Sequence, residues 1–225
     1  MSLILNIDTS TDTASACITK NGECVLIVKN ENQKEHASFI HAAIKSMLQQ
    51  TDLELTSMDA FAVTSGPGSY TGLRVGMATA KGFCYALSKP LITIGTLEAM
   101  AVAAIIDTSK KEEFLYCPMI DARRMEVFAA VYNHELNQLL PPAGMILEAE
   151  TFNSFTKNGN ILFFGTGSSK YKQIEKSPNA FFSNITFSAQ HVGLLADKAF
   201  KAKKFAEISY SQPEYLKEFF TTART

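Results

Sequence analysis

The loop Ser65–Gly72, with the sequence SGPGSYTG, carries the strongest local signal of chemistry. It lies between an apolar run and a helical pattern, where free backbone N–H groups and the helix dipole favour an anion. The loop lacks the lysine of a P-loop, and its glycines do not have GxGxxG spacing. Pro67 also removes one donor. A tight strand-to-helix turn explains the loop as well, so both interpretations stay open. The candidate anion-binding residues are Gly66, Gly68 and Ser69.

Two weaker signals also follow apolar runs. Asp8, Thr9 and Ser10 could hold a metal–phosphate group, although the same residues form Asx and ST turns on their own. A GTGS segment could pack against a ribose or phosphate, or be a simple turn. Its candidate residues are Gly165, Gly167 and Ser168.

Charged and histidine side chains give weaker indications of a functional site. Asp121, Arg123 and Arg124 could act on an anion, but a polar hairpin turn explains them equally well. His36 and His41 are five residues apart, which places them on different sides of a helix, so the sequence predicts no metal site there. No serine–histidine–aspartate pattern indicates a catalytic centre of this chain's own.

Residues 71–87 form a helical pattern with two stripes of small residues at four-residue spacing, Gly72, Gly76 and Ala80 in one and Ala78 and Gly82 in the other. Glycine inside a helix costs about 1 kcal/mol relative to alanine, which close approach to another helix would offset. That helix could belong to the same layer or to another subunit. Together with the amphipathic pattern at 36–50, this predicts a partner-binding surface. The predicted interface residues are His36, Ile40, Ile44, Gly72, Arg74, Gly76, Ala80 and Lys81.

These residues are spread over a regular order of elements. The predicted strands lie at 3–7, 13–19, 24–28, 60–63 and 91–94, and the predicted helices at 36–50, 71–87 and 96–106. Three strands followed by alternating helices and strands indicate an α/β protein with a mixed sheet covered by helices.

A second unit begins near Phe114, after a boundary at 104–113 whose polar connector is Lys110–Glu113. We expect strands at 114–120, 125–132 and 161–164, a loop at Pro141–Pro142 and a helix at about 189–205. The predicted domains are therefore 1–106 and 107–225, with the last helix a candidate to pack back toward the first domain.

Composition excludes several classes of protein. The 225 residues are 46% hydrophobic and carry a net charge of −1, which is typical of a globular chain without a general nucleic-acid footprint. Lysines gather at 157–204, where eight face two acidic residues. The four cysteines fit no zinc spacing and are expected to be buried, reduced thiols. We expect no signal peptide and no membrane segment, and hence a soluble cytoplasmic protein.

Several segments, in this order along the chain, resemble the TsaB (YeaZ) family. They are IDTSTDTASACI, TSGPGSYTGLRVGMATAKGF, DARRMEVFAAVY, FFGTGSSKY and PEYLK. The resemblance implies two lobes of the actin, Hsp70 and sugar-kinase type, each built on a ribonuclease-H-like sheet, with the second lobe reduced.

The same resemblance implies a function. Members of this family are partner subunits in the synthesis of tRNA threonylcarbamoyladenosine (t6A), pairing with the TsaD-type transferase that modifies N6 of adenosine 37. TsaD-type proteins carry an HxxxH metal motif, which this sequence lacks. We therefore expect a non-catalytic subunit without an intrinsic cofactor, acting with TsaD, the ATPase TsaE and tRNA, and dimerising when alone. ATP or another nucleotide could bind in the complex.

Two alternatives belong to the same fold. One is an ATP-dependent or glycoprotease-like enzyme that acts alone, for which Asp8 and the GTGS segment are the support. The other is a chaperone-like nucleotide-binding module.

Overall fold

The structure is a computed structural model that describes residues 1–30 and 36–216, without the side chains of residues 36 and 37. The chain divides into two compact units. Unit 1 comprises Met1–Ser109 and Ile185–Pro213, and unit 2 comprises Lys110–Asn184 and the chain from Glu214 onward. The predicted division differs, because it gave all of 107–225 to the second domain. The segment that contains the last helix belongs to unit 1 instead.

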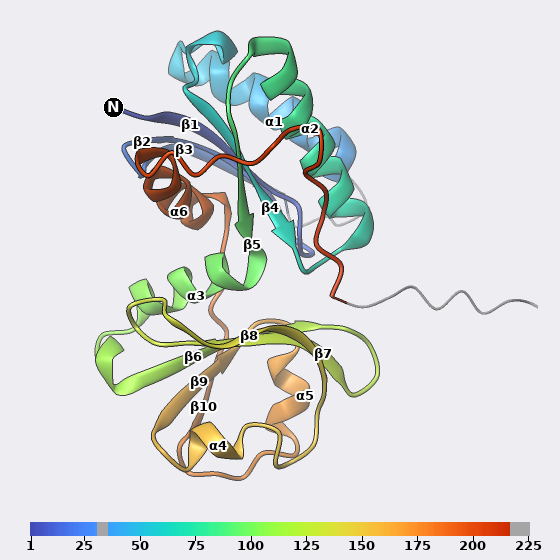
Figure 1. The fold of residues 1–225 in the computed structure, drawn as a ribbon, viewed down its shortest axis with the longest axis vertical. Coiled ribbons are helices and arrows are strands. Elements are labelled where there is room, and N and C mark those ends of the chain that lie inside the picture. The colour runs from blue at the N-terminus through green and yellow to red at the C-terminus, as the bar shows by residue number, and fades with distance from the viewer. Residues whose placement is uncertain (31–35, 217–225) are drawn as a thin grey trace, which may run out of the picture. The chain divides into compact units, whose positions relative to one another are not determined.

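Unit 1 is built on a five-stranded mixed sheet in the order β3-β2-β1-β4-β5 (Figure 1). β1 pairs antiparallel with β2 and parallel with β4; β2–β3 is antiparallel and β4–β5 parallel. The strands are β1 Leu3–Asp8, β2 Ala14–Lys20, β3 Glu23–Asn30, β4 Ala60–Gly66 and β5 Leu91–Gly95. Their apolar runs and the Asn21–Gly22 turn are the sequence features that predict them.

Helices cover both faces of this sheet. They are α1 His36–Thr51, α2 Tyr70–Leu87, α3 Thr96–Asp107 and α6 Ala189–Lys201. The core on the α1 and α2 side includes Leu5 and Ile7 of β1 together with Ile40, Met47 and Met77 from the helices. The strand period of two turns the alternate residues, among them Asn6 and Cys17, toward the other face, where α6 packs.

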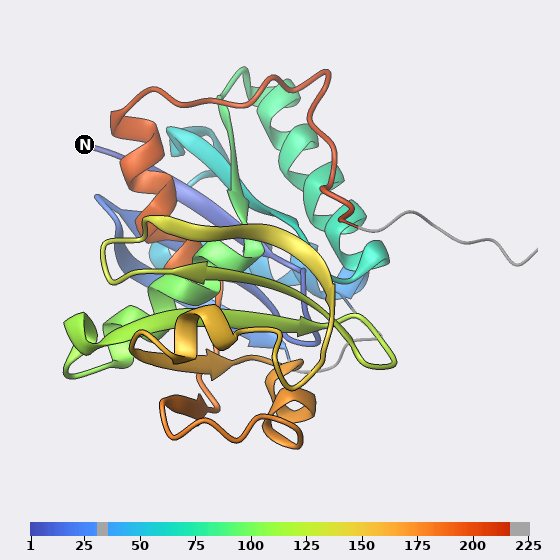
Figure 2. The ribbon, with the colours of Figure 1, turned by 60° about the horizontal axis from the view of Figure 1, so that its bottom comes forward.

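The segment that ends unit 1 is tied to distant parts of the chain. The Ala189 N–H of α6 donates to Ser15 Oγ at 2.9 Å, and the Ser2 hydroxyl donates to Asp197 Oδ1 at 2.5 Å. Beyond α6 the chain passes the start of β5 and then runs along α2, as Figures 1 and 2 both show. Ala206 N–H donates to Leu91 O there, and Lys81 Nζ donates to Ser211 O at 2.8 Å.

Unit 2 repeats the strand topology of unit 1 with small helices. Its sheet order is β10-β9-β6-β7-β8, with β6–β7–β8 antiparallel and β6–β9–β10 parallel. The strands are β6 Phe114–Asp121, β7 Glu126–Tyr132, β8 Gln138–Ile146, β9 Asn160–Phe164 and β10 Ala180–Ser183. The helices α4 Asn153–Thr156 and α5 Ser168–Lys172 pack near β9. An aromatic cluster of Phe152, Phe163 and Tyr171 fills this core.

Three sequence-based expectations about elements are wrong. Pro141 and Pro142 lie inside β8, not in a loop. They are tolerated because β8 is an edge strand and its pairing with β7 is irregular opposite Ala130, between Leu140 and Ala143. The short β10 has no predicted counterpart. The last helix ends at Lys201 and does not reach residue 205.

Candidate functional site

The end of β1 holds a buried polar cluster centred on Asp8. Its Oδ1 atom accepts hydrogen bonds from Ser10 N–H at 3.1 Å, from the Ser10 hydroxyl at 2.6 Å and from the Thr64 hydroxyl at 2.8 Å. Thr64 comes from β4, the parallel neighbour of β1, so the carboxylate joins two strand ends. Asp8, Thr9 and Ser10 are fully buried. The cluster therefore fixes the turn after β1 against the sheet.

The glycine-rich loop packs directly on this turn. Ser69 N–H donates to Ser10 O at 2.7 Å, and the Thr9 hydroxyl donates to Gly72 O at 2.7 Å. A Cβ at Gly68 would lie 2.2 Å from Ser10 O, and one at Gly72 would lie 2.0 Å from Thr9 O. Ser69 also caps α2 by accepting from Gly72 N–H. These glycines are needed because two backbone segments touch here.

The structure thus brings together two sets of residues that the sequence singles out separately, Asp8–Ser10 and Gly66–Ser69. One backbone donor of the predicted anion site, the Ser69 N–H, is occupied by the chain's own Ser10 carbonyl. Anion binding by Gly66, Gly68 and Ser69 stays a prediction.

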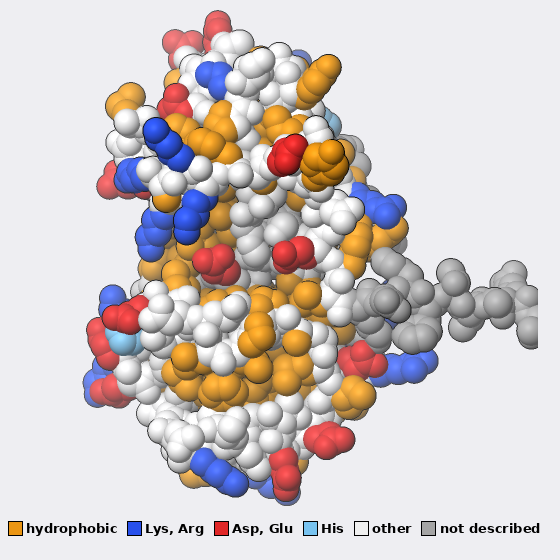
Figure 3. Space-filling view, in the orientation of Figure 1, with side chains coloured by type: hydrophobic (Ala, Val, Ile, Leu, Met, Phe, Trp, Pro, Cys, Tyr) orange, Lys and Arg blue, Asp and Glu red, His pale blue; other side chains and the backbone are white. Residues whose placement is uncertain are grey.

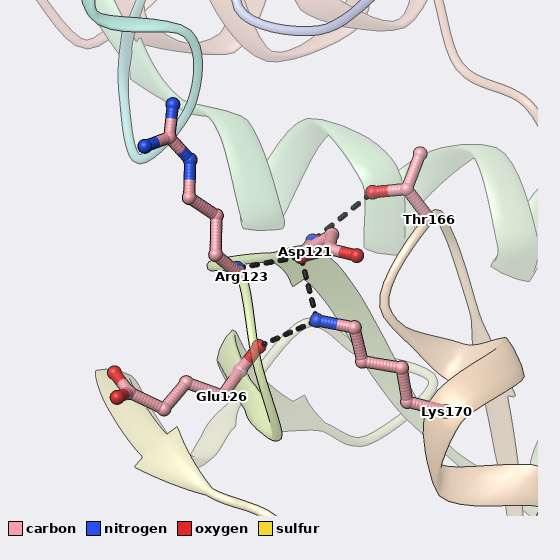
Figure 4. Close-up of polar contacts among 5 residues, drawn as sticks. All are labelled: Asp121, Arg123, Glu126, Thr166 and Lys170. Atoms are coloured by element: carbon pink, nitrogen blue, oxygen red, sulfur yellow. Dashed lines mark hydrogen bonds and ion pairs between the residues drawn. The ribbon is translucent and has the colours of Figure 1, made fainter.

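Unit 2 carries a more open counterpart at the end of β6 (Figure 4). Asp121 Oδ1 accepts from Arg123 N–H at 2.6 Å and from Lys170 Nζ at 2.6 Å, and Asp121 N–H donates to Thr166 Oγ1 at 3.1 Å. The Asp121 side chain is 42% exposed. Partial burial raises the pKa of Asp121, but the hydrogen bonds from Lys170 and the Arg123 backbone and the charge of Lys170 outweigh it and lower the pKa overall.

The GTGS segment packs against β6 and β7, beside the hydrogen bonds of Asp121. Gly167 N–H donates to Met119 O, and the Ser168 hydroxyl donates to Gly165 O at 2.8 Å. A Cβ at Gly167 would lie 2.7 Å from a methyl group of Val127, so the glycine lets the turn approach β6 and β7. A nucleotide role for Gly165, Gly167 and Ser168 stays a prediction. Lys170 and Thr166 also belong to this cluster. The sequence does not predict them, because only the fold brings them to Asp121.

Most residues of the predicted partner interface do not lie at the surface of unit 1, and their role in an interface stays a prediction. Its apolar and small members, Ile40, Ile44, Gly72, Gly76 and Ala80, are buried within unit 1. A Cβ at Gly76 would lie 2.4 Å from Thr9 Oγ1 and 3.3 Å from a Val63 methyl group. The close approach that the glycines indicate is therefore to the sheet and not to another helix. The side chain of His36 lies outside the described residues.

The opposite face of α2 is exposed. It carries Arg74, Ala78 and Gly82 at four-residue spacing, flanked by Tyr70 and Tyr85. The Arg74 guanidinium lies 3.9 Å from the centre of the Tyr70 ring, and the Tyr85 side chain is 84% exposed. Of the predicted interface residues, Arg74 is on this face and Lys81 is beside it, half-buried and bonded to Ser211. The helical period predicts two small-residue stripes, and only packing decides which one is buried.

The lysines of the stretch at 157–204 are divided between the two units. Figure 3 shows lysine side chains gathered around α6 in unit 1. Part of that charge is matched by acids. Lys201 Nζ lies 2.6 Å from Asp197 Oδ2, while burial raises the pKa of Glu98 against the opposing charges of Lys198 and Lys204.

Two kinds of feature are absent from the described residues. Within residues 1–30 and 36–216 there is no helix long and apolar enough to cross a bilayer. The same part of the chain holds no group of three histidine, cysteine or acidic side chains arranged to bind a metal ion.

Solved structures share this architecture. A Pseudomonas aeruginosa protein described as similar to peptidase YeaZ superposes with a TM-score of 0.86 at 24% identity, over 96% of this chain and 100% of that one. A candidate N-acetylmannosamine kinase from Listeria monocytogenes superposes with a TM-score of 0.53 at 11% identity, over 90% of this chain and 99% of that one. The chain thus has the fold of actin, Hsp70 and the sugar kinases, as the family resemblance implies.

Sequence comparisons identify the family to which the chain belongs within this fold. The model of the family described as TsaD, tRNA N6-adenosine threonylcarbamoyltransferase, matches residues 26–222. The tRNA threonylcarbamoyladenosine biosynthesis protein TsaB of Bacillus subtilis is 28% identical over 219 residues, which cover 95% of this chain and 93% of that protein. The chain belongs to the TsaB (YeaZ) group of this family, which confirms the resemblance seen in the sequence.

Proposed function

We propose that this chain is a non-catalytic subunit of the machinery that adds a threonylcarbamoyl group to N6 of adenosine 37 in tRNA. Its role is to bind and activate a TsaD-type transferase through the exposed face of α2 and the neighbouring surface of α1. Similarity to TsaB proteins over almost the whole chain supports the pathway. The sequence lacks HxxxH, which supports a role other than transfer itself.

One observation carries the choice of surface. Gly82 lies in the exposed part of α2, and a Cβ built on it would meet none of the residues that the structure describes within 4 Å. A glycine in a helix interior is less favourable than alanine by about 1 kcal/mol. Gly72 and Gly76 offset that cost by packing against the turn after β1 and the sheet, whereas no contact in the described part of unit 1 explains Gly82. A partner whose backbone approaches α2 at this point explains it.

The residues around Gly82 suit a protein partner. Tyrosine and arginine are enriched at protein–protein interfaces and among the residues that dominate binding energy. Tyr70, Arg74 and Tyr85 supply such groups, and Ala78 and Gly82 leave room between them. The stacking of Arg74 on Tyr70 holds part of this surface in place before binding.

The wider assembly follows from this assignment. A TsaE-type ATPase joins the TsaD-type partner, and tRNA binds through the complex. In the absence of its partner, the chain pairs with a second copy through the same face. It holds no cofactor of its own; ATP or another nucleotide acts in the complex. The compartment is the cytoplasm, where tRNA is modified.

An omission assay tests the role. The TsaD and TsaE counterparts, a threonylcarbamoyl-adenylate source, ATP and unmodified tRNA are combined with and without this chain, and labelled threonine entering tRNA is followed. Incorporation is expected only when the chain is present. Undiminished incorporation without it would contradict the proposal.

Gly82→Leu tests the surface. The leucine extends from α2 without meeting any described residue, so the fold is retained, while association with the TsaD counterpart weakens by tenfold or more, which corresponds to a loss of at least roughly 1.4 kcal/mol. Gly159→Leu in unit 2 is the matched control, because a Cβ there also meets no described residue within 4 Å. Circular dichroism checks folding and light scattering follows association. Equal association of both variants would remove α2 from the interface.

A further inference from the structure

Two cysteine side chains meet on neighbouring strands of unit 1. Cys17 lies in β2 and Cys24 in β3, and their Sγ atoms are 3.3 Å apart. Cys17 is fully buried, whereas Cys24 is exposed. The expectation that all cysteines are buried is therefore wrong for Cys24. An exposed thiol in contact with a buried one can undergo reactions that an isolated thiol cannot.

The hairpin explains why the two residues meet. β2 and β3 are joined by the Asn21–Gly22 turn, and Cys24 is paired with Thr19, two residues from Cys17 on the same face of β2. The pairing shifts between Ile18 and Thr19, which makes this part of the ladder irregular. A bulge of this kind increases the local twist and re-aims side chains. The pair lies at the edge of the sheet, because β3 is an outer strand.

The surroundings separate the roles of the two thiols. The face of β2 that carries Cys17 is the one on which α6 packs, as the bond from Ala189 N–H to Ser15 shows. Burial raises the pKa of Cys17, the neighbouring Cys24 acts in the same direction and the charge of Lys29 opposes it. Cys17 is thus a protonated thiol inside the protein, while solvent and small reagents reach Cys24.

We propose that Cys17 and Cys24 form a redox modification site, a dithiol that a hydroperoxide converts reversibly to an intramolecular disulfide. This inference is independent of the proposed function. It assigns a substrate class, small peroxides, and a product, a cross-link between β2 and β3.

The reaction has two steps. The Cys24 thiolate attacks one peroxide oxygen, the O–O bond breaks, and a sulfenic acid and hydroxide form. The Cys17 sulfur then attacks the Cys24 sulfur and displaces its hydroxyl group, which leaves with the Cys17 proton as water. The two sulfurs lose two electrons, and these reduce one peroxide. The Sγ atoms must close from 3.3 Å to about 2 Å. Excess dithiol reagent restores both thiols.

The other two cysteines serve as internal references. Cys84 in α2 and Cys117 in β6 are buried and are free thiols. Burial raises the pKa of Cys84 to about 12 and that of Cys117 well above its usual range. Because both are buried, peroxide is not expected to reach either of them in the folded protein, and Cys17 differs from them by its contact with the exposed Cys24.

The test uses the full chain treated with dilute hydrogen peroxide, then unfolded in an alkylating reagent. We expect two alkylated cysteines instead of four, an intact mass lower by two hydrogens before alkylation, and one cross-linked peptide joining Cys17 to Cys24. Reduction restores four reactive thiols. Four alkylated cysteines after treatment, or oxygen added to Cys24 with Cys17 still alkylated, would overturn the proposal.

Two variants separate this site from general oxidation. Cys24→Ser changes an exposed position and should fold like the parent; Cys17 should then stay reduced at peroxide levels that cross-link the parent. Cys17→Ser should leave Cys24 reactive, so that it gains oxygen or joins two chains. Cys84→Ser is the matched control and should still form the cross-link. A cross-linked peptide that contains Cys84 or Cys117 would also overturn the assignment.

Discussion

The turn after β1 and the turn after β6 occupy the same position in two sheets of the same topology, yet they differ in exposure. Each begins with an aspartate whose Oδ1 accepts the backbone N–H two residues later, Ser10 in one case and Arg123 in the other. Asp8 is fully buried and accepts hydrogen bonds from the Ser10 and Thr64 hydroxyl groups. The Asp121 side chain is 42% exposed and forms an ion pair with Lys170. Equal topology therefore does not give equal chemistry. The first turn holds the fold together, and the second keeps charged groups at the surface.

The helices explain this difference. In unit 1 the parallel neighbour of β1, the strand β4, leads into α2, which is 18 residues long and packs on the Thr9 backbone through Gly72. In unit 2 the corresponding helix, α5, has five residues, and its Lys170 reaches across to Asp121. A long helix closes the turn, and a short one leaves it open to solvent.

The largest expected effect is at the aspartates. Asp8→Ala leaves three buried donors without their acceptor, and each unsatisfied donor costs about 1–3 kcal/mol, so we expect a loss of about 4 kcal/mol. Asp121→Ala removes a partly exposed pair and should cost about 1 kcal/mol or less. Urea unfolding followed by circular dichroism measures both. Similar losses would end the distinction between a sealed and an open turn.

A smaller contrast is expected at the glycines. Gly72→Ala places a Cβ 2.0 Å from a backbone oxygen, which cannot move away easily, and should cost roughly 3 kcal/mol. Gly167→Ala meets a Val127 methyl group at 2.7 Å, with backbone at 3.2 Å, and should cost about 1 kcal/mol. Thermal unfolding of the two variants beside the parent gives the order. A larger loss at Gly167 would reverse our view of which turn is the tighter one.

The smallest expected effect is on pH dependence. Burial lowers the pKa of His191, so the folded state favours its neutral form and stability falls as pH drops from about 7 through that lowered pKa. The pKa of Asp121 is also lowered, so its contribution is present above about pH 4 and is lost as pH falls further. Urea midpoints measured from pH 8 to pH 3 should show both windows.

Two variants show which side chain causes each of these pH windows. His191 Nδ1 accepts the Ser188 N–H at the start of α6, and Gln at the same position can accept that hydrogen bond without titrating. His191→Gln should flatten the first window only, and Asp121→Asn the second only. A first window that persists in His191→Gln would assign it to another group.

The sequence predicts most of unit 1 because its strands are apolar runs between turn residues and its helices have long amphipathic patterns. It misses β8 because prolines indicate a loop unless the edge position and the bulge are known. It also misses the short β10.

The candidate site divides in the same way. Spacing identifies Asp8–Ser10 and the glycine-rich loop, but only the parallel pairing of β1 with β4 shows that Thr64 completes the cluster. Periodicity finds the small-residue stripes of α2 and cannot tell which one faces the sheet. It therefore selects Gly76, which is buried, and leaves out Gly82, Tyr70 and Tyr85, which are exposed.

The return of α6 to unit 1 has a consequence for synthesis on the ribosome. Unit 2 consists almost entirely of one continuous segment, Lys110–Asn184, whereas unit 1 needs residues up to Pro213. The bond between Ser2 and Asp197 joins residues 195 positions apart. The part translated first is thus completed last, and contacts of such high sequence separation form slowly. Until α6 emerges, the face of the first sheet that it covers is open to chaperones and to other nascent chains.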